Sequence, residues 1–181
     1  MIRETVELFV ALAAIAGFFI GLYQYREAQK WKRLEFAAGQ LQRLTMDPDL
    51  LLAITFLEYS KMEVPLPEKY RLLANADTFQ HDSDVLSKMM RPGYFERTPV
   101  YFVYREAFMR LFEYFEQLFQ FVDMGLIQAG DIKGTKWVLE GVIAPKYIDK
   151  AVLLEQLQKH FQDVLTLMEM LGIDVQCTDE K

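Results

Sequence analysis

The residues best suited to chemistry in this sequence are two histidines and several carboxylates. His81 is followed by Asp82 and Asp84, and these side chains offer the nitrogen and oxygen donors that divalent cations bind. The second histidine, His160, belongs to no paired His–Glu pattern, and neither does His81. The segment around His81 is more typical of a polar loop than of a metal centre. We therefore expect no bound metal ion.

A second group of carboxylates lies in a stretch with strong helical periodicity. Glu106, Glu113 and Glu116 stand there within three turns of a helix. Carboxylates on facing helices can hold two metal ions, but those sites also need a Glu-x-x-His pattern from partner helices, which is absent. Arg110 is spaced to pair with Glu106 or Glu113. This spacing predicts a solvated helix face.

Motifs of the common enzyme classes are absent from the sequence. It contains no G-x-x-x-x-G-K phosphate loop, no G-x-G-x-x-G dinucleotide motif and no G-x-S-x-G nucleophile elbow. The single cysteine, Cys177, cannot form an internal disulfide or a cysteine zinc site. We therefore expect a protein that is not an enzyme and that has no cofactor. An enzyme with an unrecognised helical site is an alternative.

Charge is distributed unevenly along the chain, whose net charge is −6. Residues 24–45 carry five Arg or Lys against two Glu, a net charge of +3, whereas residues 46–181 carry −8. Binding to nucleic acid depends on clustered cations that neutralise phosphates. The acidic body of the chain therefore argues against a nucleic-acid partner.

The predicted location of the protein depends on an apolar run near the start of the sequence. From Leu8 to Tyr23 there are sixteen residues without a charged side chain. As a helix this run is about 24 Å long, and extension to Val6 and Tyr25 gives the roughly 20 residues that cross a hydrocarbon core of about 30 Å. We predict a transmembrane anchor over residues 1–25.

A basic neck, residues 26–45, follows the predicted anchor and continues its helix. Cations next to a span favour the cytoplasmic side, so the N-terminus is expected outside and the rest of the chain in the cytoplasm. Aromatic rings at the end of the run are of the type that lies at the level of the lipid headgroups. The predicted interface and neck residues are Tyr23, Tyr25, Arg26, Lys30, Trp31, Lys32 and Arg33.

Two alternatives compete with a membrane span. A cleaved signal peptide needs a basic start and a small-x-small cleavage site. Here the residues before the run include Glu4 and Glu7, and no such site follows the run. A buried core helix is the second alternative. It is disfavoured because the run is apolar on every face, and a small domain rarely buries a helix on all sides.

Small residues form a stripe within the apolar run. Ala13, Gly17 and Gly21 are spaced by four, and the two glycines make a GxxxG pattern. Such a stripe lets two helix backbones approach closely in lipid. We predict a contact face for self-association here, with incidental small residues as the alternative.

The remainder of the chain predicts an all-α fold, with a bundle of about five to six helices over residues 46–172 and a flexible acidic tail over 173–181. Asp47 and Pro48 are suited to open its first helix, and Asp131 to cap a later one. Loops are expected at 64–67 and 75–83. The predicted helices cover residues 3–45, 48–61, 68–74, 84–90, 100–124, 132–144 and 145–171.

An aromatic ladder marks the helix predicted over residues 100–124. From Phe108 to Val122, apolar side chains recur at spacings of three and four, which gives a wide apolar stripe. This stripe is typical of the core of a helix bundle. A ligand cavity lined by these rings is the alternative.

The chain resembles a group of bacterial single-span membrane proteins with a cytoplasmic all-helical domain of unknown function. The resemblance covers most of the chain and is carried by the apolar run, by QKWKRLEFAAGQLQRL over 29–44, and by YREAFMRLFEYFEQLFQFVDMGLIQAGD over 104–131. It implies a location in the bacterial inner membrane. It supplies no catalytic residues.

These observations predict a membrane-anchored, non-enzymatic helical protein. Its expected partners are membrane lipid and either another protein or further copies of the chain, through contacts at the cytoplasmic face of the membrane. A sensor or effector of a stress or phage-defence system, which assembles in or perturbs the membrane, is an alternative from a different functional class.

Overall fold

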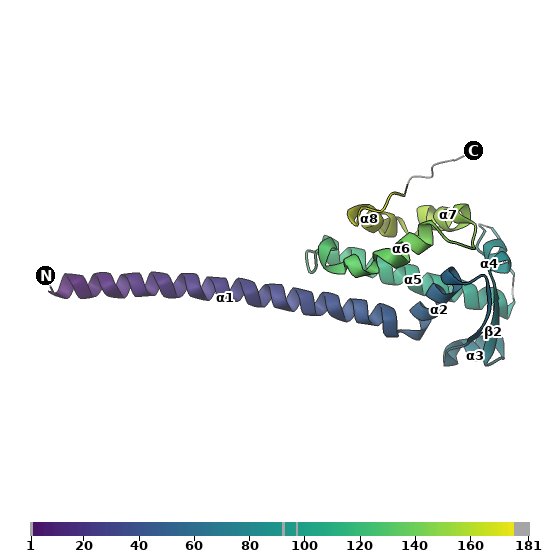
Figure 1. Ribbon diagram of the computed structural model, residues 1–181, viewed down its shortest axis with the longest axis horizontal. Helices are drawn as coiled ribbons and strands as arrows, with labels where there is room; N and C mark the ends of the chain where they lie inside the picture. Colours follow the sequence, from purple (N-terminus) through teal and green to yellow (C-terminus); the bar gives the residue numbers. More distant parts are fainter. Residues whose placement is uncertain (1, 92, 97, 176–181) are drawn as a thin grey trace.

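The computed structural model of the protein describes residues 2–91, 93–96 and 98–175, with side chains from Leu12 onward apart from Leu73. A helical domain stands at one end of a long first helix, whose N-terminal half projects away from it (Figure 1). The described residues form eight α-helices, so the all-α prediction is confirmed in its main feature. The elements are α1 (Ile2–Met46), α2 (Pro48–Glu58), β1 (Lys61–Pro65), α3 (Glu68–Ala74), β2 (Thr78–Asp82), α4 (Ser83–Met89), α5 (Pro99–Asp123), the 3₁₀-helix η1 (Ala129–Thr135), α6 (Lys136–Ile143), α7 (Lys150–His160) and α8 (Gln162–Met170).

Helix α5 forms the centre of the domain. The Thr98 hydroxyl accepts a hydrogen bond from the backbone N–H of Tyr101, and Pro99 opens the first turn. Helices α2, α3, α4 and α8 all pack against α5. The predicted aromatic ladder is confirmed as core, because five of its members are at most 1 % exposed: Phe108, Leu111, Phe112, Phe115 and Leu118.

A small antiparallel sheet corrects the two loops predicted at 64–67 and 75–83. Strands β1 and β2 pair in the register that sets Lys61 opposite Asp82 and Val64 opposite Phe79. A two-stranded sheet alone is marginally stable, and here it is supported by packing: the Phe79 ring lies 5.0 Å from that of Tyr104 in α5. Because the chain must enter β1, helix α2 ends at Glu58, earlier than predicted.

The C-terminal helices also differ from the prediction of two continuous helices over 132–144 and 145–171. Phe161 has non-helical backbone angles, φ −137° and ψ 52°, and separates α7 from α8. This break turns the Phe161 ring against Phe112, with the ring centroids 5.0 Å apart. Asp149 caps α7, which therefore starts at Lys150 instead of Pro145.

The prediction that Asp131 caps a helix is wrong in its position. Gln128 is the N-cap of η1, and Asp131 lies three residues inside, where its carboxylate accepts the Gln128 backbone N–H at 2.8 Å. The Gln128 side chain accepts the Asp131 backbone N–H in return, so the two residues cap the start of η1 together. Of the predicted tail, Ile173 is buried in the core, and residues 176–181 lie outside the described part.

Candidate functional site

The projecting half of α1 exposes large apolar side chains. Between Leu12 and Tyr25 every side chain is exposed, including Phe18 and Phe19 at more than 60 %. A Cβ atom added at Gly17 or Gly21 would meet nothing within 4 Å. Contiguous apolar surface of this kind is unfavourable in water and marks a contact with another molecule or with lipid. The predicted small-residue stripe with Ala13 lies on this uncovered surface.

Within the residues that the structure describes, none of the helices is both long enough and apolar enough to cross a membrane. The predicted anchor covers residues 1–25, and the side chains of 1–11 lie outside the described part. The predicted continuation of this helix into the neck is confirmed, because α1 runs without a break to Met46.

The basic neck forms one wall of a groove against the domain. The groove has a volume of about 530 Å³, and its opposite wall is the loop at Gly125 and Leu126 between α5 and η1. Gly125 adopts φ +72°, as expected for the residue that ends a helix. Met124 and Leu126 in this loop are more than half exposed. Of the predicted interface and neck residues, Tyr23 and Trp31 face solvent, and those that line the groove are Tyr25, Arg26, Lys30, Lys32 and Arg33.

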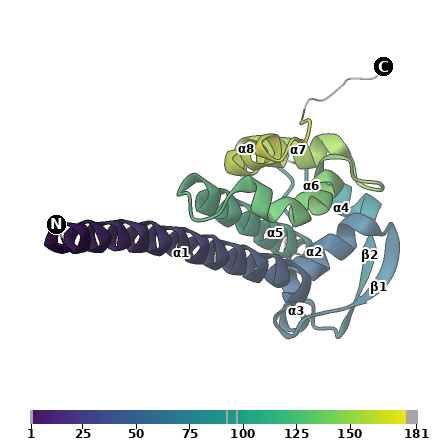
Figure 2. The ribbon, with the colours of Figure 1, turned by 60° about the vertical axis from the view of Figure 1, so that its left-hand side comes forward.

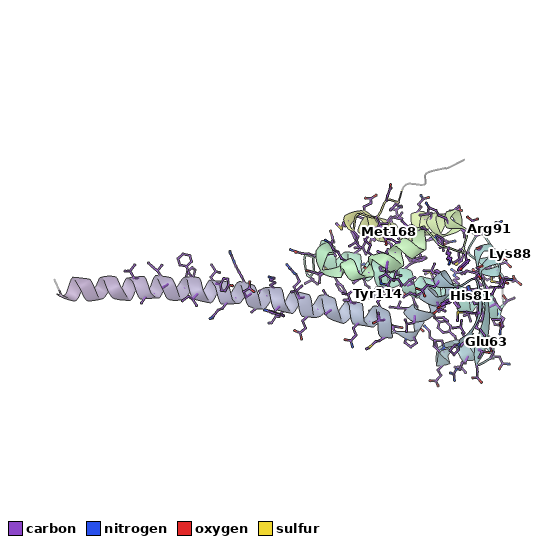
Figure 3. The ribbon with its side chains drawn as sticks, in the orientation of Figure 1. Glu63, His81, Lys88, Arg91, Tyr114 and Met168 are labelled. Atoms are coloured by element: carbon purple, nitrogen blue, oxygen red, sulfur yellow. The ribbon has the colours of Figure 1, made fainter. Side chains whose placement is uncertain are left out.

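The second half of α1 is fastened to the domain by specific contacts. The Tyr114 hydroxyl donates a hydrogen bond of 2.9 Å to the backbone oxygen of Gln40, and Phe36 meets Phe121 edge-on. Arg33 Nε lies 2.9 Å from an Asp131 carboxylate oxygen, although its N–H is not aimed at that oxygen. These contacts attach α1 to η1 and to the side of α5, where Figure 3 shows Tyr114.

His81 does not lie in a polar loop, which corrects the prediction. It is a residue of β2, is 2 % exposed, and stacks on Phe56 with ring centroids 4.8 Å apart. Its Nε2 lies 2.8 Å from the Tyr59 carbonyl oxygen and its Nδ1 lies 3.0 Å from the Tyr104 hydroxyl. Since a carbonyl only accepts, Nε2 donates to the Tyr59 oxygen, and the Tyr104 hydroxyl lies within hydrogen-bond distance of both Nδ1 and the Asp82 carbonyl oxygen, the latter at 3.2 Å.

The carboxylates beside His81 serve the fold. Asp82 caps α4 by accepting the Asp84 backbone N–H, and it pairs with Lys61 across the sheet at 3.0 Å. The hydrogen bond from Lys61 lowers the pKa of the Asp82 carboxyl. Among the described residues, no group of three or more His, Cys, Asp or Glu side chains is arranged to hold a metal ion.

The carboxylates of α5 form the solvated ion pairs that the sequence predicts. Arg110 lies between Glu106 and Glu113, at 3.3 Å and 3.2 Å from their oxygens. Lys69 of α3 also approaches Glu106, at 3.9 Å, and forms an ion pair with Asp49. Exposed pairs of this kind contribute little to stability, roughly 0–1 kcal/mol each. Glu116 is not part of the network, and burial raises the pKa of its carboxyl.

A cavity of about 420 Å³ lies beside the N-terminal half of α5. Its walls come from three segments: the loop between α4 and α5, the first half of α5, and the end of α7 with Phe161. No single stretch of sequence marks it, because its residues are spread from Met89 to Phe161. The ladder residues Phe108 and Phe112 form part of its floor. The side chains that line its mouth are Arg91, Tyr94, Arg105, Gln156, Lys159 and His160.

The environment of His81 predicts a pH-dependent stability. Burial lowers the pKa of the imidazole, so the unfolded chain binds the proton more readily than the folded chain. The free energy of unfolding should therefore be at its full value above about pH 6.5, the ordinary pKa of histidine, and should fall as the pH decreases below it. Chemical denaturation followed by circular dichroism at several pH values measures this dependence.

The matched variants are His81→Gln and His160→Gln. His81→Gln should reduce the loss of stability between pH 7 and pH 5, at a cost of about 1–3 kcal/mol at neutral pH because buried hydrogen bonds are disturbed. His160 is exposed, so His160→Gln should keep the dependence of the unmodified chain. An unchanged pH profile in His81→Gln would contradict this assignment.

Comparison with protein-family models, with curated proteins and with solved structures gives no match.

Proposed function

We propose that the protein is a single-span membrane protein whose helical domain lies at the cytoplasmic face of a bacterial inner membrane, with the N-terminus outside. The domain is a non-enzymatic module that binds another protein or further copies of the chain. The observation that carries the proposal is the projecting half of α1, whose large apolar side chains are uncovered. The sixteen-residue run from Leu8 to Tyr23 supports insertion of that half into lipid.

The groove beside the neck supports this orientation. If the apolar run lies in the hydrocarbon core, Lys30 and Lys32 lie near the lipid headgroups, where each cation contributes about 1 kcal/mol of attraction to anionic lipid. The loop with the exposed Met124 and Leu126 borders the same groove and points towards the N-terminal half of α1 (Figure 2). Apolar side chains at that level can enter the membrane interface.

Attachment of α1 to the domain supports a role in assembly. The hydrogen bond between Tyr114 and Gln40 joins the domain to the same unbroken helix that carries the small-residue stripe. Pairing of two chains through Gly17 and Gly21 would therefore bring their domains together in a defined orientation. Self-association through the stripe would thus assemble the helical domains at the cytoplasmic face.

A charge placed in the apolar run tests the anchor. Phe19→Arg should weaken insertion by about 3 kcal/mol, the difference between Phe and Arg at the centre of a membrane helix. The control is Leu72→Arg on the domain, where Leu72 is 85 % exposed. After carbonate washing of membranes, the unmodified chain and Leu72→Arg should stay in the pellet and Phe19→Arg should be partly released. Release of the unmodified chain would refute the anchor.

Bulky residues on the stripe test self-association. Gly17→Ile and Gly21→Ile should shift the mass of the detergent-solubilised protein from oligomer to monomer, because the helix backbones can no longer approach closely. Ala16→Ile is the control, since Ala16 is rotated by about 100° from Gly17 around the helix. If all three variants keep the mass of the unmodified protein, the stripe is not the contact.

A sensor or effector of a stress or phage-defence system is the second candidate. The observation in its favour is that one helix, α5, lines the cavity with Tyr101 and Tyr104 and holds α1 with Tyr114. An effector of this kind should depolarise the membrane of cells that overproduce it, and Phe19→Arg should abolish the effect. A membrane-potential dye measures this, and an unchanged potential speaks against the candidate.

A further inference from the structure

The cavity at the start of α5 has the size and the walls of a small-molecule site. Its volume of about 420 Å³ falls within the range of roughly 300–1,000 Å³ typical of ligand pockets. It is far from the apolar half of α1: Arg91 at its mouth lies at the end of the domain opposite the N-terminus of that helix (Figure 3). A ligand bound here would be reached from the aqueous side, whether or not the protein is anchored in a membrane.

The inner wall of the cavity suits a flat apolar group. Aromatic rings of α5 and Phe161 form the floor, and three methionines complete the wall. Aromatic faces favour stacked or edge-on contact with another ring, and flexible thioethers adapt to the outline of a bound group. The wall residues are Met89, Met90, Tyr101, Tyr104, Phe108, Met109, Phe112 and Phe161.

The mouth of the cavity is cationic although the protein is acidic. Arg91, Arg105 and Lys159 line it, and no described residue that lines it is acidic. In the described part of the chain, none of these three side chains forms an ion pair. Arg110, one and a half turns further along α5, is instead held between two glutamates. Unpaired cations gathered around a cavity attract an anion.

Polar groups at the mouth are held in place. Arg105 Nη1 donates a hydrogen bond of 3.0 Å to the Tyr101 hydroxyl, which orients the guanidinium next to the aromatic floor. Gln156 Nε2 donates to the Met90 carbonyl oxygen at 2.9 Å, and this bond holds the Gln156 side chain in the cavity lining. A ligand would therefore meet a fixed amide side chain beside the cations.

We propose that this cavity binds a nucleotide. The base lies against the aromatic and methionine wall, the Gln156 oxygen accepts a hydrogen bond from it, and the phosphates bind Arg91, Arg105 and Lys159. Three cations exceed what one carboxylate requires, and guanidinium groups match phosphate oxygens in pairs. Recognition by side chains would need none of the glycine-rich phosphate loops, which the sequence lacks.

The proposal is tested by isothermal titration calorimetry of the full chain in detergent, with ADP and GDP as probes. At least one of the two should bind at a single saturable site. Adenosine or guanosine, which lack phosphate, and pyrophosphate, which lacks the base, should each bind at least tenfold more weakly. Decyl phosphate, an anion with a flexible alkyl body, should also bind more weakly than the nucleotide.

Variants assign the binding to this cavity. Arg91→Gln and Lys159→Gln should each lower the affinity by about tenfold, because each removes a charge-assisted hydrogen bond to phosphate. Both side chains are exposed, so circular dichroism spectra should match that of the unmodified chain. Lys133→Gln makes the same change on the exposed surface of η1, outside the cavity lining, and should leave the affinity unchanged.

Three results would overturn the proposal. The first is the absence of saturable binding of both nucleotides to the unmodified chain. The second is nucleotide binding that neither Arg91→Gln nor Lys159→Gln weakens, which would locate it elsewhere. The third is decyl phosphate binding as tightly as the nucleotide, which would identify the occupant as an alkyl anion. None of these results bears on the membrane anchor, which carbonate washing tests separately.

Discussion

Burial of α5 is the constraint on which the rest of this structure depends. Its aromatic side chains are too large and too numerous for one neighbouring helix to cover, so α2, α3, α4 and α8 pack around it. Burying a side chain such as Phe115 or Leu118 contributes roughly 1.5–3 kcal/mol relative to leaving it exposed. The small sheet follows from the same requirement, because Phe79 and His81 of β2 close the face of α5 that carries Tyr104.

The two ends of α5 serve different purposes. Its C-terminal half holds α1 through Tyr114 and Phe121, and its N-terminal half supplies the floor of the cavity. A single rigid helix thus joins the proposed membrane attachment to the proposed ligand site.

Local patterns in the sequence were sufficient for the longest elements and failed for the short ones. The unbroken α1 and the periodic α5 can be predicted from the sequence because helical periodicity acts within a few residues. Strands β1 and β2 were missed because each is five residues long and its partner stands beyond α3. The break at Phe161 was missed because nothing local interrupts the helix there; the turn is stabilised by contact with Phe112.

The candidate sites also divide into those marked by local sequence and those formed by tertiary contacts. The sequence alone determined the apolar run, the basic neck and the small-residue stripe, because each is a property of consecutive residues on one helix. Only the tertiary structure decided that His81 is a buried, hydrogen-bonded core residue and that Arg91, Arg105 and Lys159 share the mouth of one cavity. Arg91 and Lys159 meet there although they are 68 positions apart in the chain. Their proximity depends on the tertiary packing that brings the loop after α4, the first half of α5 and the end of α7 to one cavity, which no local pattern encodes.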